Sequence, residues 1–373
     1  MSTAHTVRAL VIGAGPAGLG AAMGLARSGM EVTVLERQNM LGSERRGETI
    51  RADREMEEIL GPGFFDSIAR VRIRRRRYYS HTGSVFVDRT IANPNIVFAW
   101  PDLIGRMADH ARMLGVDIRT GVRAVRLVED NGRVNGAVAR TDRGEEIFHG
   151  GTVFLCTGSM DMIGRGYYRR HPGMDMAIRK RLVRGYSGVP DRLEYHFHLT
   201  PQGMTVGAIF PRSCAEAELL LLNTSPCAAM PGFEEFARLH PVFQWHTAGV
   251  EPFYEMESTV PMGGMIFPFS LRPGLVMAGD ILGHVQARGG SGICASFLIG
   301  HACGTAAGAV MHSGGWTAES HAAFEKAMRR HPRVRGLRAH NLFYSRVRSA
   351  IFRTIRSGSE MDRKWPLLRL MLR

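Results

Sequence analysis

The sequence predicts an α/β protein with two sheet-based domains and a helical C-terminal region, and three observations carry this prediction. A short apolar run over 8–12 enters a glycine-rich turn and then a helical pattern, as at the start of a parallel sheet. From about Met160 to Met265 the chain reads as strand-like segments broken by Gly and Pro. The last part is basic, with apolar residues mostly at helical spacing. A length of 373 residues fits about two domains.

The first strand, turn and helix carry a dinucleotide-binding pattern. Gly13, Gly15 and Gly18 stand at the spacing GxGxxG. In this pattern the first glycine allows the tight turn, the second lets the backbone approach a pyrophosphate, and the third lets the helix pack against the strand. Pro16 and Ala17 open the helix, whose free N–H groups and positive dipole end favour phosphates. The sequence therefore predicts a Rossmann-like domain.

The second strand of this unit, 31–36, ends on a carboxylate placed to accept hydrogen bonds from ribose hydroxyls. Glu36 would repel a 2′-phosphate, so FAD or NAD is favoured over NADP. We count Arg37 and Val122 among the candidate cofactor contacts. The polar stretch 41–49 is too irregular for a strand, and we expect it to lie along the cofactor, with Arg46 and Gly47 as contacts.

The next elements follow from periodicity and turn residues. Residues 57–69 predict a helical segment, and 72–79 with 84–89 predict a hairpin. The four arginines of 74–77 would project to both faces of that hairpin. They belong either to a solvated edge strand or to a seat for an anionic substrate head group or anionic lipid.

A helix is expected over 101–114 because its apolar residues recur at helical spacing up to Gly115. Two β-like pieces, 116–128 and 134–140, are joined at Asp130-Asn131-Gly132, a strong hairpin turn.

Two later strands end in small residues suited to a cofactor. The buried strand at 152–156 leads into the pair Thr157 and Gly158. A second buried strand ends in Gly279 and Asp280, whose carboxylate can hydrogen-bond a ribityl hydroxyl. A glycine-rich helix start follows, whose amides could stabilise the negative charge of a reduced flavin. The pairing implies FAD, with the helix-start candidates Gly290, Ser291, Gly292 and Ile293.

Between these nucleotide motifs lies a predicted sheet-based substrate domain, with strands at 193–199, 204–210 and 216–222. His196 and His198 alternate on one strand, but we see no acid or cysteine at ligand spacing and expect no metal. The predicted domains are a discontinuous Rossmann-like FAD-binding domain (1–70, 98–160 and 270–315), an inserted β-sheet substrate domain (71–97 and 161–269) and a basic helical C-terminal region (316–373).

With these motifs the chain resembles the geranylgeranyl reductase family, within the flavoproteins built like para-hydroxybenzoate hydroxylase. The likeness covers roughly 9–310, in four blocks taken in order: GAGPAG with Glu36; Arg46-Gly47-Glu48; Gly207 to Pro211 preceding 219–222; and Val260 to Gly264 leading into Gly279-Asp280 and Gly290 to Ile293. Three positions depart from the family pattern. Arg46 replaces a cysteine, Ala287 replaces a proline, and Gly207-Ala208 replaces an aromatic pair.

The resemblance implies hydride exchange between flavin N5 and a carbon–carbon bond of an apolar, isoprenoid or lipid-like substrate, in either direction. Reducing equivalents would come from NAD(P)H, ferredoxin or another flavoprotein. The hydroxylases of this fold carry an acid where this chain has Thr157, which favours hydride exchange over oxygen insertion. Tyr254, Glu255 and Glu257 are weak candidates for catalytic residues. The alternatives are an FAD-dependent aromatic monooxygenase and a membrane-surface carrier of the electron transfer flavoprotein:quinone type.

The charge is concentrated at the C-terminal end. From Lys326 onward there are 14 basic residues and two acidic ones, a balance of +12 within a total of +14. With apolar residues interleaved, this pattern suits an anionic membrane surface or a helical cap whose charges face water. No motif accompanies it that would indicate nucleic acid.

Cysteine usage and hydropathy bear on the compartment. The five cysteines form no C-x-x-C pair, which favours reduced thiols in a cytoplasm. No secretory signal is visible. The uncharged stretch 289–317 is expected to be a buried helix rather than a membrane span. We therefore expect a cytoplasmic protein that can attach to the inner face of the membrane.

Overall fold

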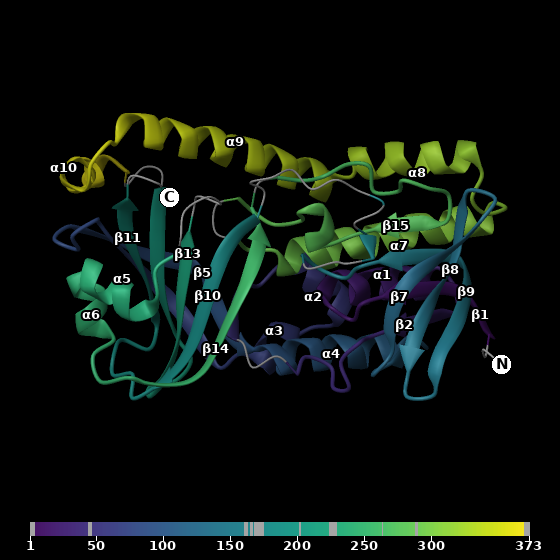
Figure 1. Ribbon diagram of the computed structural model, residues 1–373, viewed down its shortest axis with the longest axis horizontal. Helices are drawn as coiled ribbons and strands as arrows, with labels where there is room; N and C mark the ends of the chain where they lie inside the picture. The colour runs from purple at the N-terminus through teal and green to yellow at the C-terminus, as the bar shows by residue number, and fades with distance from the viewer. Residues whose placement is uncertain are drawn as a thin grey trace.

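A computed structural model describes residues 4–43, 47–159, 163–164, 167, 175–200, 203–223, 230–262, 264–287 and 290–368. The molecule is elongated, with one sheet near each end and three C-terminal helices running along one side of both (Figure 1). This arrangement confirms the predicted α/β class with two sheets and a helical C-terminal region.

The first sheet is the Rossmann-like one. Its strand order is β6-β2-β1-β9-β8-β7, and β15 pairs with β9. Strands β1, β2, β6, β9 and β15 pair in parallel, while β7, β8 and β9 form antiparallel pairs. The bounds are β1 Ala4–Ile12, β2 Val32–Leu35, β6 Asp117–Arg119, β7 Arg123–Asp130, β8 Arg133–Thr141, β9 Gly144–Leu155 and β15 Leu275–Met277. The hairpin turn predicted between β7 and β8 is confirmed, since Asn131 and Gly132 both adopt a positive φ.

Helices α1 (Pro16–Arg27) and α7 (Ile293–His312) pack closely beside this sheet. Glycines make the close approach possible: a Cβ on Gly20 would lie 2.2 Å from the Phe297 carbonyl oxygen, and one on Gly300 2.3 Å from that of Ala17. Among the described residues, α7 alone has the length and hydropathy of a membrane span, and 56% of that window is buried. Its contact with α1 agrees with the predicted buried helix. Helix α4 (Trp100–Met113) contacts α1 as well.

The second sheet has eight strands in the order β14-β10-β13-β12-β11-β4-β5-β3. Its strands are β3 Gly47–Arg51, β4 Val71–Tyr79, β5 Phe86–Ala99, β10 Asp175–Arg184, β11 Arg192–Thr200, β12 Gly203–Pro211, β13 Glu216–Asn223 and β14 Glu251–Pro261. Two expectations were wrong here. Strand β4 is an interior strand between β5 and β11, so the arginines of 74–77 are not on an edge. The stretch expected to be irregular contains β3, which pairs with β5 in this sheet although it falls within 1–70.

One face of the eight-stranded sheet is covered by α5 (Phe233–Leu239) and α6 (Pro241–His246). A small apolar core joins these helices to the sheet through Phe236, Phe243 and Leu221, all essentially unexposed. Gly207 leaves room for this contact, because a Cβ there would lie 2.3 Å from the ring of Phe236. The opposite face of the sheet is turned toward the first sheet and the C-terminal helices.

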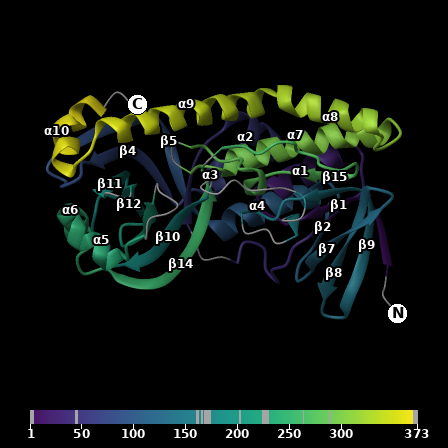
Figure 2. The ribbon, with the colours of Figure 1, turned by 45° about the horizontal axis from the view of Figure 1, so that its top comes forward.

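The C-terminal helices α8 (Ala318–Arg330), α9 (Pro332–Thr354) and α10 (Gly358–Leu368) form a band across both sheets (Figure 2). Arg333 of α9 binds Asp53 and Glu55 at 2.6–2.9 Å, which ties the band to α2 (Arg54–Leu60). At the other end, Trp365 of α10 is buried and its indole N–H donates to the Tyr78 carbonyl at 3.1 Å. The short α3 (Phe64–Ile68) follows α2, so the predicted helical segment 57–69 is split in two.

Candidate functional site

A cavity of about 1180 Å³ lies between the two sheets. It opens at the carboxyl ends of the parallel strands β1, β2, β9 and β15, where open α/β sheets bind their ligands. Most of the predicted cofactor residues line it: Gly13, Gly15, Pro16, Ala17, Glu36, Arg37, Val122, Thr157, Gly158, Gly279, Asp280, Gly290, Ser291, Gly292 and Ile293. Segments far apart in the sequence therefore meet at one site.

Three predicted cofactor residues remain: Gly18, Gly47 and Arg46. Gly18 is packed beneath it, since a Cβ there would lie 1.9 Å from the Gly13 carbonyl oxygen, which fits its predicted packing role. Gly47 lies in β3, where it pairs with Ala99 of β5. Arg46 lies outside the described residues.

The glycine-rich turn has the backbone that an incoming phosphate needs. Gly13 adopts a φ of +103°, and a Cβ on it would meet the Cys156 carbonyl oxygen at 2.5 Å, so only glycine fits. Gly15, the N-cap of α1, has open space within 4 Å of the position of a Cβ. The unobstructed backbone and the free N–H groups of the first helical turn form a cradle for a pyrophosphate.

Glu36 is fixed in orientation by the backbone around it. Its two carboxylate oxygens accept hydrogen bonds from the backbone N–H groups of Ala14 and Gln38, each at 2.9 Å. Each carboxylate oxygen can accept a second hydrogen bond, so Glu36 is held in place with capacity left for ribose hydroxyls. The backbone N–H of Val122 donates to the Glu36 carbonyl at 2.9 Å and places that residue beside it.

The second cofactor motif is braced by a buried histidine that the sequence analysis did not single out. The backbone N–H of Gly279 donates to His284 Nδ1 at 3.0 Å. Burial lowers the pKa of His284 to about 3, so the ring is neutral and can accept this bond. Ser296 of α7 reaches Asp280 at 3.4 Å, and the α7 N-terminus opens into the cavity beside it. Together these contacts join the Gly-Asp turn to the glycine-rich helix start.

The rest of the cavity wall comes from the eight-stranded sheet and α9 and is largely apolar. Side chains from six neighbouring strands, β4 to β14 in the sheet order, share the cavity face: Tyr78, Tyr195, Phe197, Met204, Val206, Ala208, Phe210, Leu220, Leu222, Ile178 and Met256. His340, Tyr344 and Val347 of α9 close it on another side. The nearby segment 266–269 does not line the cavity, because Phe269 is buried in the main core.

One ion pair stands within this apolar wall. Lys180 Nζ lies 3.4 Å from Glu218 Oε1, and the two side chains are only 7% and 4% exposed. Lys180 lies two residues after the cavity-lining Ile178 and so shares its face of β10. This alternation along the strand is the sequence signal that could have placed Lys180 in the cavity. A buried lysine paired with a carboxylate is a group that can hold and release a proton in an otherwise apolar space.

The weak catalytic candidates are elsewhere. Glu255 and Glu257 of β14 bind Arg181 and Arg179 at 2.9 and 2.5 Å, on the strand face opposite to the cavity-lining Met256. Tyr254 does not line the cavity either. The expectation that these three residues could reach the pocket was wrong, because the alternation of β14 turns the two acids away from it.

The arginine run on β4 divides between the two faces of the sheet. Arg75 and Arg77 bind Asp191 and Asp88, each at 2.6 Å. Arg76 lines the cavity, where it donates to Asn95 Oδ1 at 2.7 Å, while its Nε has no hydrogen-bond partner among the described residues. This arginine therefore places a positive charge at the cavity wall.

Comparisons with known proteins agree with this site. Residues 6–150 match the FAD binding domain family. The fold is similar to that of a geranylgeranyl bacteriochlorophyll reductase-like protein from Thermoplasma acidophilum, with a TM-score of 0.84, 18% identity, and coverage of 98% of this chain and 92% of that one. A myxobacterial chondrochloren halogenase, an FAD-dependent enzyme, is similar with a TM-score of 0.69, 14% identity, and coverage of 92% and 82%.

A curated relative in sequence comes from Escherichia coli (strain K12) and is named a probable electron transfer flavoprotein-quinone oxidoreductase. It is 24% identical over 311 residues, which cover 74% of this chain and 70% of the relative. The cradle of Gly13 and Gly15, the oriented Glu36 and the Asp280 turn fit the diphosphate, ribose and ribityl parts of FAD. The chain is therefore an FAD-dependent oxidoreductase, with an FAD binding domain at residues 6–150 and the fold of a geranylgeranyl reductase-like flavoprotein.

Proposed function

We propose that the protein reduces, or in reverse dehydrogenates, a carbon–carbon bond of an apolar, isoprenoid or lipid-like substrate. The observation that carries the proposal is the shared cavity. One cavity is lined on one side by the residues that fit FAD. On the other side it is lined by apolar side chains of the eight-stranded sheet. At about 1180 Å³ the cavity exceeds the usual range for one small ligand, which leaves room for a cofactor and a substrate.

FAD, when bound, supplies hydride exchange with carbon. The chain's own residues must hold the alkene, exclude water and deliver a proton to the neighbouring carbon. The aromatic and aliphatic side chains of β4, β11, β12 and β13 serve the first two tasks, and methionines such as Met204 and Met256 adapt to an irregular chain. The positive charge of Arg76 in the cavity wall suits an anionic group at one end of the substrate.

Lys180 is the candidate proton donor. Its ammonium group lines the cavity, and Glu218 stabilises the charged form from 3.4 Å away. Transfer of one proton from Nζ to carbon would leave a neutral amine beside a carboxylate, and the pair would recover the proton from solvent between turnovers.

The test is a single-turnover experiment with anaerobically reduced enzyme, which makes the natural electron donor unnecessary. A polyprenyl diphosphate with several double bonds is mixed in, and flavin reoxidation is followed together with product mass. Gain of two hydrogens without oxygen is the expected result. An enzyme that is inert to alkenes but adds one oxygen atom to an aromatic compound in air would be a monooxygenase, and the proposal would fail.

Variants at the ion pair test the role of Lys180. Lys180→Met should slow alkene reduction at least about tenfold while FAD affinity stays unchanged, because general acid catalysis is worth at least that much. Removing one partner leaves Glu218 buried and uncompensated, so Lys180→Met/Glu218→Gln serves as a second variant that restores neutrality. Full activity in both variants would remove Lys180 from the mechanism.

A second candidate function is electron transfer to a quinone, which the named activity of the Escherichia coli relative favours. Both functions use an apolar cavity beside the flavin, so reactivity must separate them. Reduced enzyme is mixed with a short-chain ubiquinone and, separately, with the alkene. Rapid quinone reduction with no change in the alkene would support the carrier over the reductase.

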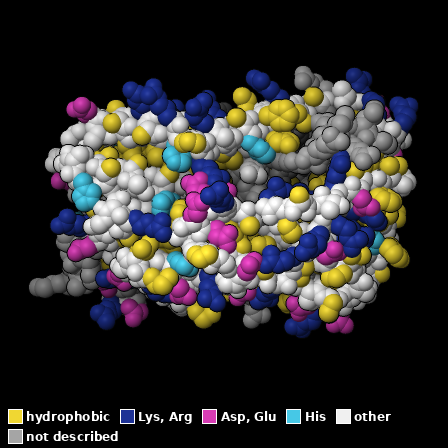
Figure 3. Space-filling view, turned by 180° about the vertical axis from the view of Figure 1, so that it is seen from behind, with side chains coloured by type: hydrophobic (Ala, Val, Ile, Leu, Met, Phe, Trp, Pro, Cys, Tyr) yellow, Lys and Arg dark blue, Asp and Glu magenta, His cyan; other side chains and the backbone are white. Residues whose placement is uncertain are grey.

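The outer face of α9 supports a membrane-surface location for either function. Leu342 and Phe343 are 54% and 59% exposed on a helix that also carries the exposed Arg335 and Arg346. Basic and apolar side chains lie together along this edge of the molecule (Figure 3). Another face of the same helix, including Tyr344, lines the cavity. We propose that α9 rests on an anionic bilayer, so that an apolar substrate can enter the cavity beside it.

Vesicle co-sedimentation tests this attachment. Binding should rise with the anionic lipid fraction and fall with salt, at about 1 kcal/mol for each basic residue near the surface. Leu342→Ser/Phe343→Ser should weaken binding, whereas the same change at the exposed Leu239 of α5 should have no effect. Equal binding of all proteins to neutral and anionic vesicles would contradict the proposal.

A further inference from the structure

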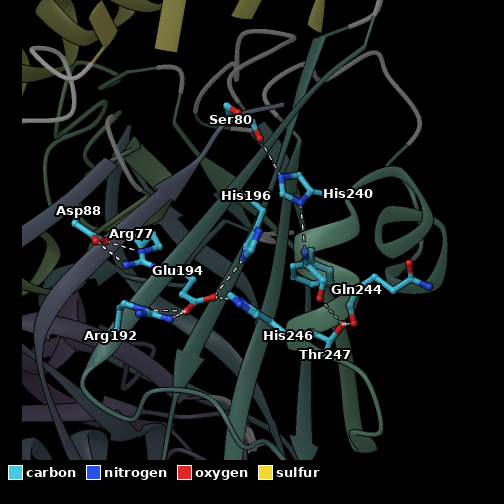
Figure 4. Close-up of polar contacts among 11 residues, drawn as sticks. Arg77, Ser80, Asp88, Arg192, Glu194, His196, His240, Gln244, His246 and Thr247 are labelled. Atoms are coloured by element: carbon cyan, nitrogen blue, oxygen red, sulfur yellow. Dashed lines mark hydrogen bonds and ion pairs between the residues drawn. The ribbon is translucent and has the colours of Figure 1, made fainter. Parts of the chain in front are cut away.

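A second polar cluster lies on the face of the eight-stranded sheet that is turned away from the cavity. Glu194 and His196 alternate on β11, and His246 reaches toward them from the end of α6 (Figure 4). One potential ligand atom from each residue lies within 4.8 Å of the other two. The expectation that no acid stands at ligand spacing to a histidine was wrong, because strand alternation places Glu194 on the same face as His196.

The carboxylate of Glu194 is oriented so that one oxygen faces the two imidazoles. Arg192 Nε and an Arg192 terminal nitrogen both donate to Oε1, at 2.9 and 2.5 Å. The other oxygen, Oε2, lies 3.6 Å from His196 Nε2 and contacts His246 Nδ1. Arg192 thus fixes the group and leaves Oε2 directed into the cluster.

His196 is completely buried, yet neither of its ring nitrogens has a hydrogen-bond partner within the described part of the chain. A buried polar atom without a hydrogen-bond partner destabilises the folded state, and native structures rarely leave one unexplained. The ring is nevertheless firmly placed. Tyr79 stacks on it with centroids 4.7 Å apart, and His240 meets it edge-on at 4.8 Å. A ligand for His196 Nε2, the ring nitrogen that faces Glu194, is therefore expected between His196, Glu194 and His246.

We propose that Glu194, His196 and His246 bind one divalent transition-metal ion of the zinc class. Two imidazoles and a carboxylate are typical zinc ligands, whereas magnesium and calcium prefer oxygen alone. A tetrahedral ion with bonds of about 2.0–2.1 Å holds its ligand atoms roughly 3.3 Å apart. The 3.6 Å between Glu194 Oε2 and His196 Nε2 is already close to that spacing.

The fourth position of such an ion falls to water, on the side where His246 is 11% exposed. The ion would connect β11 to α6 and so fasten the α5–α6 layer to the sheet. It takes no part in the flavin chemistry, because the cluster and the cavity lie on opposite faces of β11.

The alternative to a metal ion is a proton on His246, which would then form an ion pair with Glu194. Metal loading distinguishes the two. Tag-free protein is stripped with chelator, dialysed against Zn²⁺ or Co²⁺, and analysed for bound metal and for the visible absorption of tetrahedral Co²⁺. We expect one ion per chain and a rise in melting temperature on loading. Fewer than about 0.1 ions per chain, or binding only at millimolar metal, would overturn the proposal.

Variants locate the ion. His246→Ala should lower the affinity for Zn²⁺ at least about tenfold and abolish the Co²⁺ absorption, and Glu194→Gln should do the same. Gln244→Ala is the matched control, since Gln244 is an exposed residue of the same short helix and should bind as the wild type does. Unchanged binding by His246→Ala would place the ion elsewhere. If the variant of the buried Glu194 fails to fold, X-ray absorption of the zinc-loaded wild type must show two imidazoles and oxygen, and a shell without imidazole would overturn the assignment.

Discussion

The two sheets of this oxidoreductase build their parts of the cavity in different ways. On the Rossmann-like side, the wall is mostly backbone, shaped by glycines such as Gly13 and Gly279 and by the start of α7. On the side of the eight-stranded sheet, the wall is made of side chains from neighbouring strands, with one ion pair between Lys180 and Glu218. The first side therefore serves a cofactor common to many enzymes, and the second is free to vary with the substrate.

The largest expected effect of a small substitution lies on the backbone-shaped side. Gly300→Ala places a Cβ 2.3 Å from the Ala17 carbonyl oxygen, so α7 and α1 must separate. We expect a loss of at least about 3 kcal/mol in the free energy of unfolding, at the upper end of overpacking effects. Chemical denaturation measures it. The control is Gly105→Ala in α4, where a Cβ has nothing within 4 Å, and which should stabilise the protein by roughly 0.5–1 kcal/mol.

Loss of the ribose acceptor is the next largest effect. Glu36→Ala removes the bonds to FAD and also leaves the Ala14 and Gln38 N–H groups without their acceptor. FAD affinity should weaken by about 2–4 kcal/mol, or roughly 30- to 1000-fold, as for one or two bonds to a charged group. Flavin fluorescence titration gives the dissociation constant. Glu31→Ala, at the exposed approach to the same strand, should bind FAD normally. Equal affinity of both variants would contradict the assignment of Glu36.

The buried His284 on the cofactor side should make the free energy of unfolding depend on pH. Burial holds the pKa of His284 at about 3, against 6.5 when exposed, so only the unfolded state takes up this proton between those values. Stability from this residue is present above pH 6.5 and is lost as the pH falls, by at most about 1.4 kcal/mol for each pH unit. Denaturation curves at pH 7, 6 and 5 measure the slope. His284→Asn should show a shallower slope than the wild type, and identical slopes would remove His284 as the cause.

The smallest effect concerns the tie between α9 and α2. Arg333→Ala removes the ion pairs with Asp53 and Glu55, but the arginine side chain is 37% exposed and solvent weakens the interaction. We expect a loss of about 0.5–1 kcal/mol, measured by thermal unfolding. Arg335→Ala, at an exposed position of the same helix, should change stability by less than that. A loss no greater than that of the control would show that packing alone fastens α9.

The same contrast explains which parts of the site the sequence predicts. The cofactor side depends on local patterns, so the glycine turn, Glu36, the Gly279-Asp280 pair and the α7 start can be recognised in the amino-acid sequence alone. The FAD residues lie on segments of fixed spacing within a known motif. Strand β3 was missed because its partner, β5, is distant in the chain and the polar stretch around it has no period-2 signal.

The substrate side depends on which strands become neighbours, and sequence alone does not determine that. Lys180 and Glu218 meet only because β10 pairs with β13, and Tyr254, Glu255 and Glu257 were misplaced for lack of the strand register. His246 meets Glu194 only because α6 folds over the sheet. The arginines of β4 were ambiguous for the same reason, since an edge and an interior strand can share one pattern.

Strands β4 and β11 form a partition with an aromatic pair on each side. Tyr78 stacks on Tyr195 within the cavity at 5.1 Å, and the next residues along, Tyr79 and His196, stack at 4.7 Å on the opposite side. Each strand thus contributes adjacent residues to the cavity on one face and to the cluster of Glu194, His196 and His246 on the other. Any ligand that alters the spacing of these strands on one side alters it on the other. Thermodynamic linkage then requires the influence to be mutual: if occupancy behind the partition tightens substrate binding by some factor, substrate tightens binding behind it by the same factor.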